Sequence, residues 1–112
     1  MDIKDRFVTK KRPPKIENLL EKIKECLEQK RYTHTEHAIV RKKEREITLA
    51  EIRHILMTGC EEKIKSRFNE HYNTWNYAIR GKTKIEKLDV RVIVAFDEKG
   101  MLIITVMYVG GL

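Results

Sequence analysis

The spacing of the apolar residues changes at Gly59, and this change limits the folds open to the chain. Before Gly59 the apolar residues recur three and four positions apart, the spacing of an amphipathic helix. After Gly59 they alternate with polar residues, the spacing of a half-buried strand. Helices that precede strands joined by short turns are typical of the α+β class. We therefore expect three helices followed by a four-stranded, mostly antiparallel sheet, with the helices on one face.

Three helices are expected in the first half. An apolar stripe that runs from Ile16 to Leu27 predicts a helix over Lys15–Lys30. Capping-box patterns begin at Thr33 and at Thr48, and they predict helices over about 34–46 and 49–58.

The third of these helices has a clear apolar face. Leu49, Ile52, Ile55 and Leu56 have helical spacing and are expected to face the core. Gly59 stands where a left-handed residue commonly ends a helix, so we expect it in that conformation.

Four strands are expected in the second half. Alternation predicts strands over Glu61–Phe68, Trp75–Ile79 and Leu88–Phe96. Asp97–Gly100 has the composition of a hairpin turn, and Met101–Val109 is expected to pair back as a central strand.

The chain is basic, with 24 Lys and Arg against 17 Asp and Glu and a formal net charge of +7. The excess is most concentrated in residues 1–13 and 31–46, with net charges of +3 and +2. Residues 1–14 are therefore interpreted as a basic arm that ends at Pro13-Pro14, and residues 15–109 as a single domain. A basic surface of this kind suits a phosphate-rich or acidic partner.

Several classes of protein do not match this sequence. The longest apolar stretch, Met101 to Val106, is too short to cross a bilayer, and the N-terminal residues are charged where a signal peptide is apolar. We expect a cytoplasmic protein that does not bind a membrane. Cys26 and Cys60 lie far apart and are expected to be buried free thiols. Neither a glycine-rich phosphate loop nor a metal-ligand spacing is present, so no cofactor is expected.

The stretch from His37 to Arg45 is the strongest candidate for a catalytic or ligand-binding site. On a helix, His37, Arg41, Glu44 and Arg45 share one face. A histidine can transfer a proton near neutral pH, and arginines beside it can bind phosphate and stabilise added negative charge. Glu44 can orient an arginine or act as a base. The same pattern is also typical of an ordinary solvated helix surface.

A second group of candidates lies on the expected strands. Arg80 and Arg91 are candidates for further phosphate contacts if they face the helix that carries His37. Tyr77, Tyr108 and Trp75 are candidates for stacking on a base. The alternation around Trp75 and Tyr77 is equally typical of core packing.

These residues resemble domain-of-unknown-function family 4258. The resemblance covers about Tyr32 to Tyr108 and rests on three segments: the run His37-Ala38-x-x-Arg41-x-x-Glu44-Arg45-x-Ile47-Thr48, then Tyr77-x-x-Arg80-Gly81, then Ile104-Thr105-Val106-x-Tyr108. Glu46 stands where the family often has Gly, and Lys42 where it often has Met. The family is similar to the BrnT and RelE group of small bacterial toxins, which fold as helices packed on a four-stranded sheet.

The resemblance implies a toxin of a toxin–antitoxin pair, a metal-independent endoribonuclease that acts on RNA, including RNA on the ribosome. It implies catalytic roles for His37, Arg41, Glu44 and Arg45, and extends to Arg80, Tyr77 and Thr105. A cognate antitoxin protein is the implied partner. Two other hypotheses stay open: a non-catalytic RNA- or protein-binding module that uses the same basic face, and a fold that pairs with a partner protein through an open sheet edge.

Overall fold

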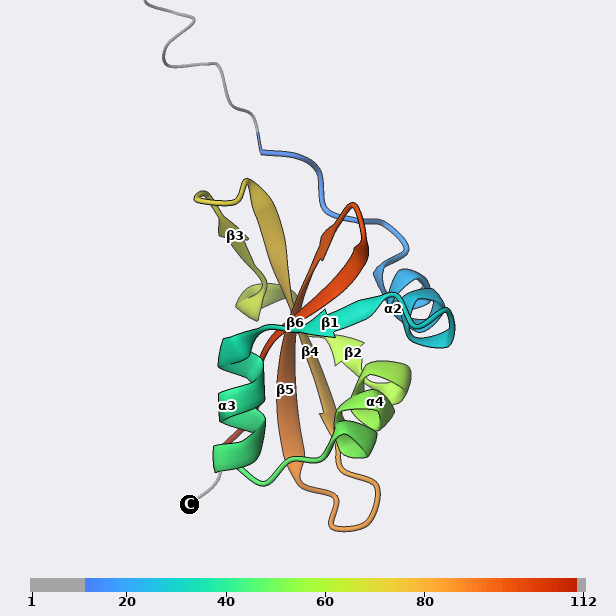
Figure 1. The fold of residues 1–112 in the computed structure, drawn as a ribbon, viewed down its shortest axis with the longest axis vertical. Helices are drawn as coiled ribbons and strands as arrows, with labels where there is room; N and C mark the ends of the chain where they lie inside the picture. Colours follow the sequence, from blue (N-terminus) through green and yellow to red (C-terminus); the bar gives the residue numbers. More distant parts are fainter. Residues whose placement is uncertain (1–11, 111–112) are drawn as a thin grey trace, which may run out of the picture.

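The structure, a computed structural model, describes residues 12–110 (Figure 1). The elements in chain order are α2 (Leu19–Glu28), β1 (Tyr32–His34), α3 (Glu36–Glu44), α4 (Leu49–Thr58), β2 (Cys60–Glu61), the 3-10 helix η1 (Lys63–Lys65), β3 (Arg67–Asn69), β4 (Thr74–Lys82), β5 (Asp89–Asp97) and β6 (Gly100–Tyr108). The α+β class is confirmed. No helix within residues 12–110 has the length and apolar character needed to span a membrane.

The sheet has six strands rather than the four expected. Its order is β1-β6-β5-β4-β2, and β3 pairs with the first half of β4. The expected strand over 61–68 is broken by η1 into β2 and β3. The expected order of helices and then strands is also wrong, because β1 lies between α2 and α3 and pairs with β6 in parallel. All other pairings are antiparallel.

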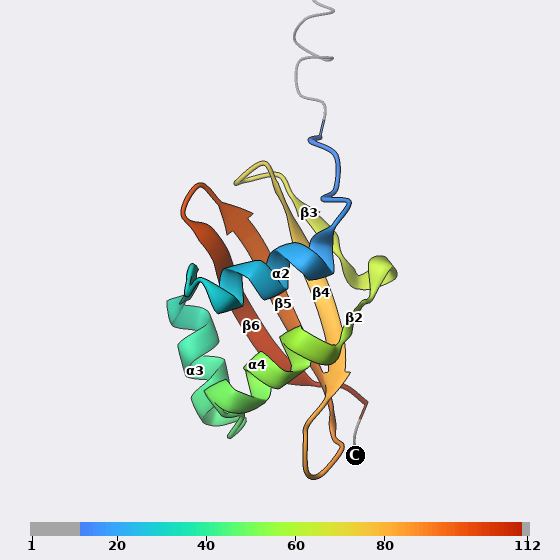
Figure 2. The same cartoon turned by 90° about the vertical axis from the view of Figure 1, so that its right-hand side faces the viewer.

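One face of the sheet is covered by α2 and α4, which cross in front of the strands in Figure 2. Paired residues share a face, and alternate residues of each strand point to it. The core between the layers contains Leu19, Ile23 and Leu27 of α2, Ile52, Ile55 and Leu56 of α4, and Ile79, Val92, Val94, Ile103 and Val106 of the sheet. Burial of these apolar side chains is the main favourable term in folding.

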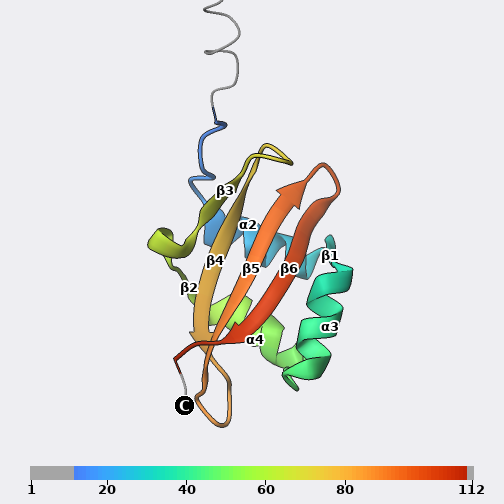
Figure 3. The same ribbon diagram turned by 90° about the vertical axis from the view of Figure 1, so that its left-hand side faces the viewer.

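No helix of residues 12–110 covers the opposite face of β4, β5 and β6, as Figure 3 shows. We call it the open face. By register it carries Asn76, Ala78, Arg80 and Lys82 of β4, Asp89, Arg91, Ile93 and Ala95 of β5, and Leu102, Thr105 and Met107 of β6. A β-bulge between Ile93 and Val94 shifts the β5–β6 register and leaves Ile104 as the extra residue.

The helix α3 does not join the other two helices on their face, which corrects the expectation of all helices on one side. It lies along the edge of β6, beyond the end of β1 (Figures 1 and 3). The Thr35 hydroxyl donates to the carbonyl of Ile104 at 3.0 Å, and the Arg45 guanidinium donates to the carbonyl of Val106. These bonds satisfy carbonyls on the β6 edge that β1 is too short to reach.

The ends of α3 and α4 follow the capping rules with one correction. Thr48 and Glu51 form the predicted capping box of α4. For α3 the N-cap is Thr35, whose side chain accepts from the backbone N–H of Ala38, and not Thr33. Thr33 is occupied in β1, where it pairs with Leu102. Leu49, expected in the core, is exposed in the first turn of α4.

Gly59 is not left-handed, so the predicted helix terminator is wrong. Its φ of −81° and ψ of −179° are extended. A Cβ at this position would lie 2.5 Å from the carbonyl oxygen of Arg80 and 2.6 Å from that of Ile55. Glycine is therefore required by the close approach of α4 to β4, and not by backbone conformation.

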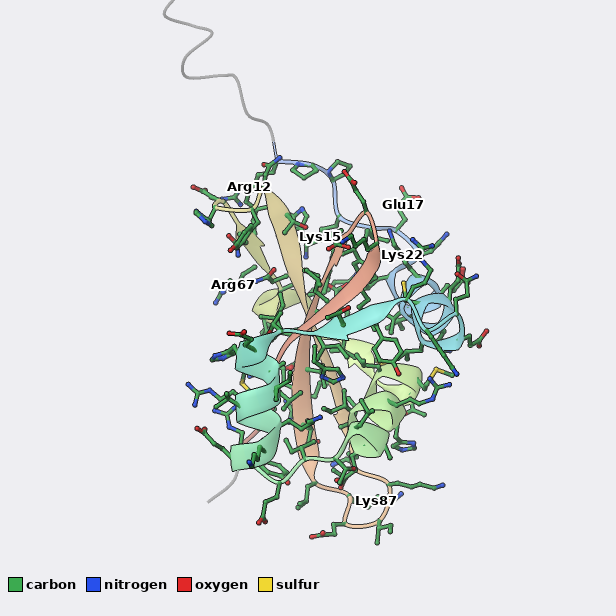
Figure 4. The ribbon with its side chains drawn as sticks, viewed as in Figure 1. Arg12, Lys15, Glu17, Lys22, Arg67 and Lys87 are labelled. Carbon is green, nitrogen blue, oxygen red and sulfur yellow. The ribbon has the colours of Figure 1, made fainter. Side chains whose placement is uncertain are left out.

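The segment before α2 packs against the sheet. Trp75 donates its indole N–H to the carbonyl of Pro13, and the Lys15 ammonium lies 4.9 Å from the centre of the Trp75 ring. The guanidinium carbon of Arg12, a residue labelled in Figure 4, lies 4.8 Å from the centre of the Phe68 ring. Residues 12–14 of the expected arm are thus attached to β3 and β4, and residues 1–11 lie outside the described part. Both cysteines are free thiols, but only Cys26 is buried.

Candidate functional site

The central charged cluster of the open face joins three strands. Arg80 and Arg91 lie directly opposite each other on β4 and β5. Glu62, just after β2, contacts both, and Asp89 contacts Arg80 and Lys82. Like charges paired across strands repel each other, so the carboxylates between them are what allow this arrangement.

Arg91 is committed to Glu62. Its Nε donates to Oε1 at 2.7 Å and its Nη2 donates to Oε2 at 3.2 Å, a two-pronged geometry. The Arg91 and Glu62 side chains are only 15% and 18% exposed. The hydrogen bonds from Arg91 hold the pKa of Glu62 below its usual value, although burial opposes the shift. Arg91 therefore supports the fold and is poorly placed to bind a ligand.

Arg80 is more accessible. Its side chain is 41% exposed, and its contacts with Glu62 and Asp89 are long, at 3.5 and 3.4 Å. Exposed ion pairs with such geometry contribute little to stability, so a phosphate can replace them at small cost. Arg67 of β3 extends the same basic surface, and Figure 4 shows it projecting away from α2.

The face of α3 that bears His37 flanks the open face. Ala38 is fully buried, and Arg45 donates a hydrogen bond to the carbonyl of Val106. The strip of the α3 surface that joins these two residues therefore faces β6. Lys42 lies on one flank of this strip, close enough to lower the pKa of His34. His34 pairs with Ile103 and shares its helix-covered face.

At about 100° per residue, His37, Arg41 and Glu44 lie on the opposite flank of this strip from Lys42. This flank therefore faces the open side of the sheet. His37 is exposed there, and Arg41 pairs with Glu44 at 2.8 Å across one helical turn. Arg45, the fourth residue predicted on this face, is instead engaged with the β6 backbone.

Tyr77 lies in the core and not on the open face. It is 2% exposed, and its hydroxyl accepts a hydrogen bond from the backbone N–H of Ile16 at 2.9 Å. Burial raises the pKa of Tyr77. The structure thus separates Tyr77 from the arginines with which sequence reasoning grouped it, and gives it a packing role.

Thr105 and Tyr108 lie in different places. Thr105 is half-buried on the open face opposite Ile93. Tyr108 ends β6 opposite Val90. Burial, followed by the charges of Glu51, Glu86 and Glu46, raises the pKa of Tyr108, which places it toward the α4 end of the molecule. Of the predicted substrate contacts, only Thr105 and Arg91 share the open face.

A cavity of about 680 Å³ lies on the open face at the end away from Arg80. It is bounded by Thr35 before α3, by the turn between β3 and β4, and by the hairpin between β5 and β6. Its lining residues are Thr35, Asn69, Tyr72, Asn73, Thr74, Asn76, Ala95, Phe96, Asp97, Glu98, Leu102 and Ile104. The volume is in the range of small-molecule sites.

Glu62 is the residue of this site that sequence reasoning missed. The assignment of a continuous strand over 61–68 gave it no special position. The signal was the position of Arg80 and Arg91 on neighbouring expected strands, because two arginines that lie opposite each other across strands require a nearby carboxylate. Within residues 12–110 no group of three or more His, Cys, Asp and Glu side chains is arranged to hold a metal ion.

The model of the family described as Domain of unknown function (DUF4258) matches residues 34–108. The chain belongs to this family. The DUF4258 match includes α3, α4, the open face and its cavity, whereas α2 precedes it. Neither a curated protein nor a solved structure matches the chain.

Proposed function

We propose that this DUF4258 protein is a RelE- or BrnT-like toxin that cleaves RNA across the open face. The observation that carries the proposal is the position of α3 along β6. It brings the flank with His37 and Arg41 to the same side of the sheet as Arg80, Arg67 and Thr105.

The chemistry follows from these side chains. His37 takes the proton of a ribose 2′-hydroxyl, and the 2′-oxygen attacks the adjacent phosphorus. The bond from phosphorus to the 5′-oxygen of the next nucleotide breaks, and that oxygen takes a proton from water. Arg41 stabilises the negative charge that builds on the phosphate. The products are a 2′,3′-cyclic phosphate and a 5′-hydroxyl.

In this proposal the other predicted catalytic residues have different roles. Glu44 holds Arg41 in an exposed ion pair that a phosphate can displace. Arg45 anchors α3 to β6. Arg80 contacts a neighbouring phosphate, and Arg91 keeps Glu62 in place beside it. A cognate antitoxin would inhibit such an enzyme by covering the open face.

An RNA digest in excess chelator tests the proposal. The native protein is expected to yield fragments with cyclic phosphate ends, identified by mass spectrometry. His37→Ala is expected to lower the rate by about 100-fold or more. His37 is exposed, so this variant should fold. His54→Ala, on the helix α4 across the sheet, is the matched control and should cleave normally.

Arg41 is tested in the same assay. Arg41→Gln is expected to slow cleavage by about 100-fold, the loss typical of one charge-stabilising group. Lys43→Gln, an exposed position on the outer surface of α3, is the control and should retain activity. Absence of cleavage by the native protein on every RNA tried would reject the enzyme, whereas equal activity of His37→Ala would reject His37 as the base.

A second candidate is a non-catalytic RNA-binding module. The observation that favours it is the neutralisation of the open-face arginines by Glu62 and Asp89, which lowers the local charge available to a transition state. This function predicts binding with a steep salt dependence and no strand scission. His37→Ala would then bind as the native protein does.

A further inference from the structure

The cavity on the open face differs chemically from the rest of that face. None of its lining residues, all within the described part, is a lysine or arginine. Its floor is apolar, with Ala95, Leu102 and Ile104, and its walls carry the amide of Asn76 and the hydroxyl of Thr74. The cations of the open face lie outside this lining. Arg67 is paired with Asn76 across β3 and β4, and Arg80 and Arg91 lie further along β4 and β5. A phosphate would therefore bind near these arginines, and an uncharged group would bind in the cavity.

The rim of the cavity also disfavours phosphate. Asp97 and Glu98 line its edge, and the Asp97 carboxylate accepts from the backbone N–H groups of Lys99 at 2.8 Å and Gly100 at 3.0 Å. These bonds hold the carboxylate in place. Tyr72, 73% exposed, stands at the opposite edge. An apolar floor, an exposed aromatic ring and amide walls are the features that bind a flat heteroaromatic ring.

One wall atom lacks a partner. The Oδ1 atom of Asn76 is buried and accepts no hydrogen bond within the described structure. A buried acceptor in this state is destabilising. Because the atom is closed to solvent, a ligand in the cavity reaches it only when the Asn76 side chain turns toward the cavity, and an N–H donor of the ligand then removes the penalty. Together with the rim carboxylates, this makes the cavity rich in acceptors. It therefore favours a ring that presents N–H donors on its edge.

We propose that the cavity binds one unpaired base of single-stranded RNA, and that it selects a base with an exocyclic amino group over uracil. The inference rests on the proposed function, since it names the part of the substrate that lies beyond the phosphate contacts. Tyr72 stacks on the base and Asn76 accepts from its amino group. Uracil is expected to bind more weakly because its single N3–H donor is flanked by two carbonyl oxygens, which would lie against the acceptors of the cavity.

The position of the cavity suits this role. Asn76 and Arg80 are four residues apart on β4, which corresponds to about 13 Å along a strand. Thr35 lines the cavity, and His37 follows it by two residues on the flank of α3 that faces the open side. A base in the cavity would thus hold its ribose near His37 and extend the following phosphates toward Arg41 and Arg80.

Equilibrium binding to RNA that cannot be cleaved tests the inference. Fluorescence anisotropy would compare a 2′-O-methyl adenine octamer with a 2′-O-methyl uracil octamer and with an abasic octamer of equal charge. The adenine strand is expected to bind about tenfold or more tightly than the abasic strand, and more tightly than the uracil strand. Tyr72→Ala and Asn76→Ala should reduce the adenine affinity toward the abasic value.

The controls separate base recognition from phosphate binding. Asn18→Ala removes an exposed asparagine before α2, whose side chain forms no cap, and should bind like the native protein. Arg80→Gln should weaken binding of all three strands by a similar factor. Equal affinity for the adenine and abasic strands would overturn the inference, as would the absence of any binding.

A second measurement does not depend on the variants folding. In ¹⁵N NMR spectra, adenosine 5′-monophosphate is expected to shift the side-chain amide of Asn76 and the backbone signals of Leu102 and Ile104, while ribose 5-phosphate should not. No shift at these positions would overturn the inference and would favour a protein partner for the cavity. Base-dependent binding without cleavage would reject the ribonuclease alone, and cleavage without base dependence would reject the base site alone.

Discussion

Arg91 and Glu62 hold each other through two hydrogen bonds, one from Nε to Oε1 at 2.7 Å and one from Nη2 to Oε2 at 3.2 Å. Glu62 belongs to the connection after β2, two strands away from β5. The same carboxylate contacts Arg80 at 3.5 Å. A single glutamate thus keeps two guanidinium groups side by side at the centre of the open face.

Glu62→Gln is expected to lower the free energy of unfolding by about 1–3 kcal/mol, because it leaves the largely buried Arg91 without its carboxylate. Urea denaturation measures the change. Glu70→Gln is the matched control, since Glu70 pairs with Arg12 in an exposed position and its loss should cost about 0.5 kcal/mol or less. An equal change in the free energy of unfolding for the two variants would show that Glu62 contributes no more to stability than an exposed surface charge.

His34 is expected to make stability depend on pH. Both ring nitrogens are buried, and neither finds a hydrogen-bond partner among residues 12–110. Burial, followed by the charge of Lys42, lowers the pKa of His34. The unfolded chain therefore binds the proton more tightly. Stability should fall as the pH drops below about 6.5 and level off below the folded-state pKa.

His34→Phe removes the titrating group and keeps an aromatic ring beside Tyr32. In thermal or urea denaturation, its unfolding free energy should vary less between about pH 7.5 and about pH 5.5 than that of the native protein. These two values lie about one unit either side of the ordinary histidine pKa. His71→Phe, at an exposed histidine, should keep the native pH dependence. An unchanged profile in His34→Phe would assign the dependence elsewhere.

Substitution of Gly59 distinguishes a steric requirement from a conformational one. Asparagine tolerates the left-handed conformation, so at a left-handed helix terminator Gly59→Asn would be much milder than Gly59→Ala. At the extended Gly59 of this structure, any Cβ meets the carbonyls of Arg80 and Ile55. Both variants are expected to lose about 2 kcal/mol or more in urea denaturation. Rescue by asparagine would contradict the close approach.

Tyr77→Phe is expected to cost about 0.5–1.5 kcal/mol, since it removes the hydroxyl that accepts from the backbone of Ile16. Cleavage of RNA per folded molecule should not change. The measurements are thermal denaturation and the chelator digest at a temperature where both proteins are folded. A loss of activity without a loss of stability would return Tyr77 to the list of substrate contacts.

Local patterns predicted the parts of the fold that depend on neighbouring residues. The capping box at Thr48, the helix over Leu49–Thr58 and the hairpin at Asp97–Gly100 each rest on residues a few positions apart, and all three are confirmed. The apolar stripe from Ile16 to Leu27 located α2 but overestimated its length. The helix starts only after Asn18, and it ends at Glu28, just before Lys30, whose φ of 56° is left-handed.

Long-range contacts account for what the sequence did not predict. β1 has three residues, too few for a periodic pattern, and exists because β6 provides a partner. The edge position of α3 depends on carbonyls of Ile104 and Val106 more than 60 residues away. At the site, helical spacing grouped His37, Arg41 and Glu44 correctly on one flank. It did not reveal that Arg45 turns to the backbone, or that Glu62 lies between Arg80 and Arg91.

The parallel pairing of β1 with β6 has a consequence for biosynthesis. β1 and α3 are made early, yet the strand that holds them is the last strand within residues 12–110, and Thr35 bonds to a residue 69 positions later. While the ribosome still holds β6, the helix with His37 has no sheet edge to pack against. A nascent or truncated chain that ends before Gly100 therefore lacks the strand that pairs with β1 and the carbonyls that hold α3. Folding of β1 and α3 into the sheet must wait until β6 has left the ribosome.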